Sequence, residues 1–183
     1  MYTVVSWGSM MYMAGSQGIP CREIQCYDQH PISAARNLAV TEFLQDKNNS
    51  HILFLDDDVV VPPDIIPRLL NHKKLITSGW YLLRGNRLPS VFQKNKYGWT
   101  PLNVQQLKPN LMEVDGTAAG ALMIDRKALE VIKPPWFLEG GKDSREESTQ
   151  GEDLYFCQKA HDYGMKVYVD GNLRCGHHHF IVL

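Results

Sequence analysis

The spacing of apolar residues along the chain alternates between helical and strand-like. A first helix is predicted over residues 2–14, where helical spacing fits better than strand alternation and the apolar positions are Val4, Trp7, Met11 and Ala14. A wide apolar stripe over 32–44 predicts a second helix that begins at Pro31. Residues 51–55 contain a continuous run of Ile, Leu, Phe and Leu that ends abruptly, which is typical of a strand buried on both faces.

The rest of the chain continues this alternation. We expect short strands over 22–27, 75–81, 118–124 and 165–169, helices over 64–72, 126–132 and 154–161, and a hairpin with loops over 84–113. Gly164 stands where the last helix needs a C-terminal cap. Residues 139–150 are polar, contain glycine and lack apolar periodicity, so a mobile loop is expected there. Helices and strands in this order predict an α/β domain with a mainly parallel mixed sheet.

Composition and charge narrow the class of protein. The 183 residues suit one domain over 1–183, and a hydrophobic share of 44% is enough for a sizeable core. A net charge of −1 argues against a nucleic-acid binder, which normally carries a basic excess. No apolar run is long enough to cross a bilayer and no signal peptide is recognisable, so we expect a cytoplasmic protein. We expect free, mostly buried thiols at Cys21, Cys26, Cys157 and Cys175.

Three consecutive aspartates, Asp56, Asp57 and Asp58, follow the predicted buried strand directly. Ligands of open α/β sheets gather outside the carboxyl ends of strands. Adjacent carboxylates repel one another, and a hard divalent cation that prefers oxygen ligands relieves this repulsion. The alternative interpretation is a solvated acidic turn or an aspartate that caps the next helix.

At this point several segments resemble a known family. The segment HILFLDDDVVVPPDII is similar to the DxD strand and following helix of GT-A glycosyltransferases, particularly the inverting group called family 2. GTAAGALMIDRKALE resembles the family's glycine-containing strand, and GEDLYFCQKAHDYGMKVYVD resembles its Glu-Asp helix and closing strand. GHHH stands in the place of the C-terminal histidine ligand, and SAARN resembles the segment that leads into the helix before the DxD strand. These motifs follow the family's order and cover most of the chain, which implies a GT-A α/β/α sandwich.

The resemblance also implies roles for individual residues. Asp56 would face the nucleotide ribose or a metal ion, and Asp58 would ligate the metal that bridges the diphosphate. His177 or His178 would complete a site for Mn²⁺ or Mg²⁺, which acts as a Lewis acid on the departing nucleoside diphosphate. Asp153 would be the general base that deprotonates an acceptor hydroxyl, and the helix N-terminus there would keep it ionised. Asp153 as a helix cap, and exposed histidines without a ligand, remain the alternatives.

Further candidates surround this set. Donor-binding candidates are Arg36, Asp56, Asp57, Gly116 and Gly120. Acceptor-binding candidates are Trp80, Tyr81 and Glu152. Arg36 is expected to contact either the diphosphate or an aspartate of the cluster, unless it is a surface arginine. The glycines allow a sugar to approach the backbone or allow tight sheet packing, and the two aromatic residues stack on a sugar or belong to the core.

The ends of the chain differ from the family pattern. Helical spacing over 2–14 favours an N-terminally truncated piece that lacks the family's first strand, over the alternative that residues 3–7 form that strand. The acceptor site is then expected from residues 84–113 and the 139–150 loop, which would close over the donor, or from a partner. The apolar N-terminal segment, with Trp7, Met10, Met11 and Met13, could pack on a second copy in a homo-oligomer.

The sequence therefore predicts a metal-dependent, inverting glycosyltransferase that uses a UDP- or GDP-sugar donor and a glycan, lipid or protein acceptor. One alternative is a sugar-nucleotide nucleotidyltransferase, although residues 8–18 supply glycine without the lysine or arginine of a phosphate loop. The other alternative is a non-catalytic domain that binds a nucleotide or a sugar.

Overall fold

The structure, a computed structural model, describes residues 2–24, 31–140 and 151–178. The helices are α1 (Tyr2–Ser16), α2 (Ile32–Gln45), α3 (Ile65–Asn71), α4 (Arg126–Val131) and α5 (Glu152–Asp162), with a 3-10 turn at Val104–Gln106. The longer strands are β1 (His51–Leu55), β3 (Ile76–Trp80), β6 (Leu111–Val114), β8 (Ala121–Asp125) and β9 (Val167–Arg174). The remaining strands are β2 (Val59–Val60), β4 (Val91–Asn95), β5 (Gly98–Pro101), β7 (Gly116–Thr117) and β10 (Gly176–His177).

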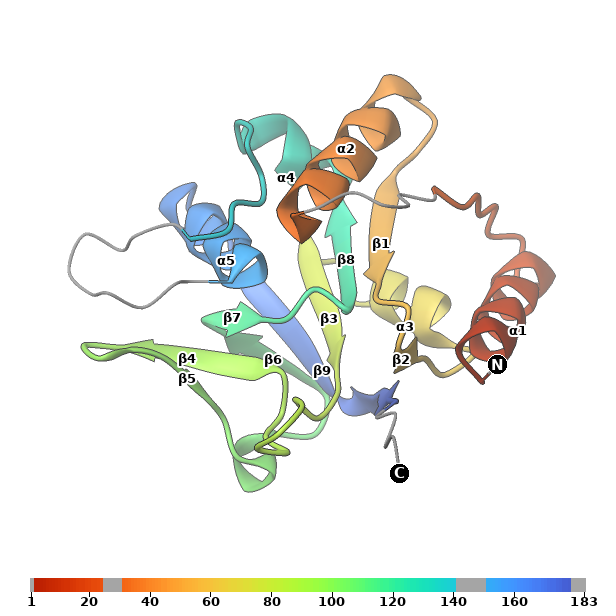
Figure 1. Cartoon of the computed structure of the whole chain (residues 1–183). Helices are drawn as coiled ribbons and strands as arrows, with labels where there is room; N and C mark the ends of the chain where they lie inside the picture. The colour runs from red at the N-terminus through yellow and green to blue at the C-terminus, as the bar shows by residue number, and fades with distance from the viewer. Residues whose placement is uncertain (1, 25–30, 141–150, 179–183) are drawn as a thin grey trace.

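The main sheet has the order β1-β8-β3-β9-β6 (Figure 1). β1 and β3 both pair antiparallel with β8, β6 pairs antiparallel with β9, and β3 and β9 form the parallel pair. The predicted α/β class with a mixed sheet is confirmed. The sheet is not mainly parallel as expected, because most neighbouring strands are antiparallel. β1 and β3 do run in the same direction, but β8 lies between them in the opposite direction.

Helices cover both faces of this sheet, which gives the expected α/β/α layers (Figure 1). Buried residues of α2, α4 and α5 form one hydrophobic core with one face, and residues of α1 and α3 form a second core with the other. Along β1, Ile52 and Phe54 belong to the first core while Leu53 and Leu55 pack against the second. Both faces of β1 are therefore packed, as its continuous apolar run predicts.

Most helix predictions are confirmed, including the helix over 2–14 in preference to a strand at 3–7. On α1, Met10 and Ala14 are buried in the second core, whereas Met11 is exposed. Gly164 has φ +75°, and Met165 N–H donates to the Ala160 carbonyl at 2.9 Å, so the predicted C-terminal cap is present. Within the described ranges, no helix combines the length and the apolar character needed to cross a membrane.

Three predictions of strands and loops are wrong in part or fall outside the described residues. The strand expected over 118–124 begins later than predicted, because β8 spans Ala121–Asp125, and the residues just before the expected range, Gly116–Thr117, form the separate strand β7 that pairs with β4. Residues 22–24 are not strand, and the rest of the strand expected over 22–27 lies outside the described residues. Most of the loop expected over 139–150 lies outside them too.

The cysteines follow the expectation in part. Cys157 and Cys175 are buried free thiols, and burial raises the pKa of both to about 12. Cys21 is a free thiol too, but it is exposed. Cys26 lies outside the described residues.

Candidate active site

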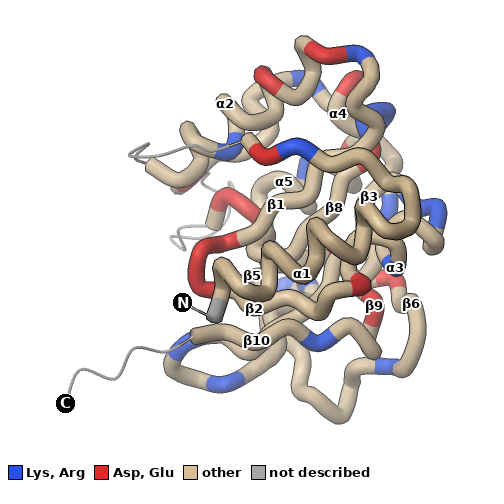
Figure 2. The backbone as a smooth tube through the Cα atoms, turned by 90° about the vertical axis from the view of Figure 1, so that its right-hand side faces the viewer, with Lys and Arg blue, Asp and Glu red and all other residues tan. Residues whose placement is uncertain are grey.

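The three aspartates form a tight turn at the carboxyl end of β1. Asp56 N–H donates to the Gly120 carbonyl at 3.3 Å, and Val59 N–H donates to the Asp56 carbonyl at 3.0 Å, which closes the turn. Asp57 is exposed at the turn, whereas the side chains of Asp56 and Asp58 keep only 31% and 15% of their surface exposed. Figure 2 shows this acidic stretch in red on the same side of the molecule as the acidic start of α5. The turn thus separates one solvated carboxylate from two that have partners inside the protein.

Arg36 of α2 joins the acidic turn to the start of α5. Its guanidinium donates to Asp56 Oδ1 at 2.9 Å and forms a second ion pair with Glu152, which is 116 residues away in the chain. Arg36 is 6% exposed, and its guanidinium lies 5.9 Å from the centre of the Phe137 ring. Burial alone lowers the pKa of Arg36, but the charges of Asp56 and Glu152 outweigh burial and raise it overall. Contact with an aspartate of the cluster is one of the two roles expected for Arg36.

Asp153 lies beside this ion-pair cluster at the first turn of α5. Its Oδ1 accepts a hydrogen bond from the Leu154 backbone N–H at 2.7 Å. Burial, together with the charge of Glu152, raises the pKa of Asp153 to about 6, although Arg36 and the Leu154 N–H oppose the shift. The expected stabilisation by the helix N-terminus is therefore outweighed by desolvation. Asp153 remains mostly ionised at pH 7 and holds a pKa suited to accepting a proton.

Asp58 and His177 form the second part of the site, on the far side of the turn from Arg36. His177 Nδ1 lies 2.8 Å from the Leu82 carbonyl oxygen, which can only accept, so we assign the proton to Nδ1. In the neutral ring, Nε2 then carries a lone pair, and it lies 3.2 Å from Asp58 Oδ2. Nε2 therefore donates to Asp58 when the ring is protonated and offers its lone pair to a cation when the ring is neutral.

The spacing of these two atoms fits adjacent ligands of a divalent cation. Two ligands at right angles, each about 2.1 Å from a metal, lie about 3.0 Å apart. A metal-bound histidine also typically donates its other N–H to a carbonyl or carboxylate, as His177 does to Leu82. One imidazole and one carboxylate are both common ligands of divalent cations. Among the described residues, however, no group of three or more His, Cys, Asp or Glu side chains is close enough to hold a metal by itself.

The predicted four-residue metal set is thus only partly assembled. Asp58 and His177 face each other, but Asp56 is paired with Arg36 instead. His178 reaches the turn through its backbone, since its N–H donates to the Asp58 carbonyl at 2.8 Å. The pairing of β10 with β2, His177 opposite Val59, brings the C-terminal histidines to the turn.

Gly120 and Tyr81 form the wall next to Asp56. A Cβ atom on Gly120 would lie 2.5 Å from the Tyr81 hydroxyl and 2.7 Å from Asp56 Oδ2, so only glycine leaves room for both. The Gly120 N–H donates to the Tyr81 hydroxyl at 3.3 Å, and the Tyr81 ring meets His177 edge-on at 4.9 Å between centres. Tyr81 therefore connects the Asp56 side of the turn with the histidine side.

Other predicted site residues occupy packing positions. A Cβ on Gly116 would lie 2.8 Å from side-chain carbons of both Leu154 and Trp99, so this glycine permits tight packing at α5. Trp80 is 5% exposed, belongs to the first core, and donates its indole N–H to the Gly171 carbonyl at 2.9 Å. The structure does not bring Trp80 into the site, and its role as an acceptor platform stays a prediction without support from the geometry.

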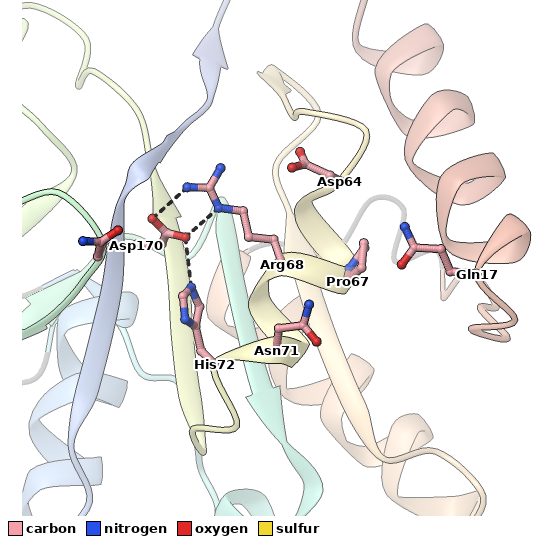
Figure 3. A pocket seen from close by; sticks show the side chains of 8 residues that line it. Gln17, Asp64, Pro67, Arg68, Asn71, His72 and Asp170 are labelled. Carbon is pink, nitrogen blue, oxygen red and sulfur yellow. Dashed lines mark hydrogen bonds and ion pairs between the residues drawn. The ribbon is translucent and has the colours of Figure 1, made fainter.

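A polar cluster that was not predicted from the sequence lies between α3 and β9. Asp170 is 1% exposed, and it accepts hydrogen bonds from Arg68 Nε at 2.7 Å and from His72 Nε2 at 2.9 Å (Figure 3). These residues line a hollow of about 430 Å³. Asp170 ends the strand motif VYVD, which was the available signal. The cluster fastens α3 to the sheet.

Arg84 is a further residue near the site that the sequence did not predict. It lies in the loop between β3 and β4 and forms an ion pair with Asp58 Oδ2. Because it stands in an exposed loop without periodicity, no sequence pattern points to this contact. Arg84 brings a second arginine to the acidic turn, opposite Arg36.

Comparison with known proteins supports the fold. No protein-family model matches the sequence, and no curated protein matches it. The structure of A197 from STIV is similar with a TM-score of 0.62 and 25% identity, over 95% of this chain and 79% of that one. The structure of GalNAc-T7 with UDP, GalNAc and Mn²⁺ is similar with a TM-score of 0.58 and 13% identity, over 91% of this chain but 34% of that one. The chain thus spans about a third of the GalNAc-T7 chain, and the similarity shows a fold of the GT-A type.

Proposed function

We propose that this protein is a metal-dependent glycosyltransferase that moves a sugar from a nucleotide-diphosphate sugar to an acceptor hydroxyl. The observation that carries the proposal is the paired placement of Asp58 Oδ2 and His177 Nε2, 3.2 Å apart, at the end of β1. The Arg36 ion pairs connect the same turn to the start of α5, where Asp153 has a raised pKa. A GT-A-like fold makes this end of the sheet the expected donor site.

The metal would be held by Asp58 and His177, with the diphosphate of the donor completing the ligand set. GalNAc-T7 was crystallised with Mn²⁺ and UDP, which supports the same class of cation and a UDP-sugar here. When bound, the ion supplies Lewis-acid stabilisation of the charge on the departing diphosphate. Asp56, held by Arg36 and bordered by Gly120, would orient the donor beside it.

Asp153 is the proposed general base. Its carboxylate accepts the proton of the acceptor hydroxyl while the hydroxyl oxygen bonds to the anomeric carbon. The bond from that carbon to the diphosphate oxygen breaks, and the nucleoside diphosphate leaves with the electron pair. A single displacement of this kind inverts the configuration of the sugar. Glu152, fixed by Arg36, lies next to the base and is the proposed acceptor-binding residue. Tyr81 is as buried as Trp80, at 5% exposed, and belongs to the second core, so it borders the site through the hydroxyl that accepts from the Gly120 N–H.

Calorimetric titration of UDP and GDP, with Mn²⁺ and then with EDTA, tests the donor site. We expect wild-type protein to bind one nucleotide only with Mn²⁺, and Asp58→Asn to lose that binding. Asp64→Asn is the matched control, because Asp64 is exposed at the N-terminus of α3 and makes no capping hydrogen bond there. Equal binding with EDTA, or full binding by Asp58→Asn, would contradict the proposed metal site.

Release of nucleoside diphosphate from a UDP- or GDP-sugar, with mixed glycan, lipid and protein acceptors, tests the chemistry. We expect Asp153→Asn to keep Mn²⁺-dependent nucleotide binding and to lose turnover. Pyrophosphate release from a nucleoside triphosphate and a sugar phosphate would identify a nucleotidyltransferase instead. Binding without any turnover in wild type would identify a non-catalytic domain.

A further inference from the structure

Arg84 places a positive charge at the oxygen that the proposed metal needs. Its guanidinium pairs with Asp58 Oδ2, and this same oxygen faces His177 Nε2 at 3.2 Å. The Arg84 side chain is 64% exposed, whereas that of Asp58 is 15% exposed. The charged end of Arg84 thus reaches inward from solvent to a carboxylate that is largely covered.

A guanidinium and a divalent cation compete for this position. Both bind the lone pairs of Asp58 Oδ2, and their like charges repel at such short range. A metal ligated by Asp58 and His177 therefore requires Arg84 to move away from Oδ2. Because the side chain of Arg84 is long and mostly in solvent, it can leave by rotating its own torsions.

The backbone that carries Arg84 is held in place at both ends of its loop. Ser90 N–H donates to the Tyr81 carbonyl at 2.8 Å, and Leu83 N–H donates to the Leu88 carbonyl at 2.8 Å. His177 is tied to the same loop through the Leu82 carbonyl. The displaced guanidinium consequently stays next to the metal pair, where the phosphates of a donor would lie.

We propose that Arg84 is an exchangeable counter-ion, which neutralises Asp58 in the nucleotide-free protein and transfers to the donor diphosphate when metal and nucleotide bind. This inference rests on the proposed function. The planar guanidinium suits phosphate oxygens, which it binds with two parallel hydrogen bonds. Metal alone must displace Arg84 without compensation, whereas metal with nucleotide gives Arg84 a new anionic partner. Mn²⁺ and UDP therefore bind with positive coupling, and Arg84 supplies part of it.

The test compares wild type, Arg84→Gln and Arg87→Gln. Arg87 is an exposed arginine of the same loop, so its substitution removes an equal charge nearby. Binding of Mn²⁺ alone is measured by electron paramagnetic resonance, and binding of UDP at saturating Mn²⁺ by calorimetry. We expect Arg84→Gln to bind Mn²⁺ alone about 2- to 5-fold more tightly, as loss of a partly exposed ion pair implies. We expect its UDP affinity to fall about 10-fold or more, as loss of a charge-assisted hydrogen bond implies.

Arg87→Gln should leave both constants within about twofold of wild type, since it removes only a screened charge. Weaker binding of Mn²⁺ alone by Arg84→Gln would overturn the inference, as would unchanged binding of UDP. If wild type binds no nucleotide in the presence of Mn²⁺, the proposed function and this inference fail together. If wild type binds and both variants match it, only this inference fails.

Discussion

Arg36 offers the sharpest test of how the site is held together. Its buried guanidinium is the link between Asp56 after β1 and Glu152 at the start of α5. Substitution of Arg36 by Met keeps a long apolar side chain against Phe137 but removes the charge. Asp56 and Glu152 would then face each other and Asp153 without a compensating cation. We therefore expect a loss of stability together with a change in the titration of Asp153.

The magnitude follows from burial. Removing one partner of a fully buried ion pair costs about 3–5 kcal/mol. Here the Asp56 side chain is 31% exposed and that of Glu152 14%, so water recovers part of the lost interaction. We expect Arg36→Met to lower the free energy of unfolding by about 2–4 kcal/mol, less than the typical total of about 5–15 kcal/mol.

Urea unfolding at pH 7.5, followed by tryptophan fluorescence, measures this loss. The control is Arg22→Met, because Arg22 pairs with Glu42 at 3.3 Å and both side chains are largely exposed, at 44% and 46%. An exposed pair of this kind contributes less than about 1 kcal/mol. If Arg36→Met costs no more than Arg22→Met, the buried ion pairs do not hold the site together and the reasoning is refuted.

The pH dependence supplies a second measurement on the same variant. Arg36 lowers the pKa of Asp153 from what burial alone would set, so its loss raises that pKa above about 6. A carboxyl whose folded-state pKa is raised contributes stability that is complete below its unfolded pKa and is lost as pH rises through the folded value. The deficit of Arg36→Met should therefore be largest near pH 8 and should shrink toward pH 4. A deficit independent of pH would contradict the electrostatic explanation.

Three further substitutions, two in the site and one in α1, have expected effects on stability or binding. Asp153→Asn should raise the free energy of unfolding at pH 7.5 by on the order of 1–3 kcal/mol, because the wild-type carboxyl has a pKa raised to about 6 and is ionised there at a cost. The asparagine can still accept from the Leu154 N–H, and no gain is expected at pH 4. Urea titrations at both pH values check this. Gly120→Ala should cost about 1–3 kcal/mol and weaken Mn²⁺-dependent UDP binding, because its Cβ would displace the Tyr81 hydroxyl or the Asp56 carboxylate; unchanged calorimetry would contradict it. Gly8→Ala should stabilise α1 by about 0.5–1 kcal/mol, since nothing lies within 4 Å of the added Cβ, and thermal unfolding measures the gain.

The secondary structure could be predicted from the sequence where the local pattern was strong. The strand over 51–55 has the predicted bounds, because Ile52 and Phe54 pack against the first core while Leu53 and Leu55 pack against the second. The order of strands in the sheet could not be predicted in the same way. Ile124 of β8 pairs with Ile52 on one side and Ile76 on the other, and no local feature of these three residues specifies such long-range partners.

The site shows the same division between local and distant causes. His177 of the GHHH segment lies next to Asp58 of the aspartate run because β10 pairs with β2, the short strand that follows the acidic turn. The partner of Asp56 was anticipated only as one of two possibilities for Arg36. The raised pKa of Asp153 ran against the expectation from the helix N-terminus, because the burial that causes it depends on how α5 packs. Arg84 was not anticipated, since its contact depends on the conformation of a loop.

The two arginines compensate the two covered carboxylates of the acidic turn, Arg36 at Asp56 and Arg84 at Asp58, while Asp57 is exposed to water. Arg36 keeps 7% of its side-chain surface exposed and pairs with two carboxylates, so its departure would leave both of them partly buried and uncompensated. Arg84 keeps 64% exposed, so returning it to water costs little. The ion pair that breaks at little cost is therefore Arg84–Asp58, next to His177. The ion pairs of Arg36, which orient Asp56 and Glu152, cost more to break. Compensation of the acidic turn is therefore permanent on the side of the proposed base and replaceable on the side of the proposed metal, as the binding of a metal and a donor requires.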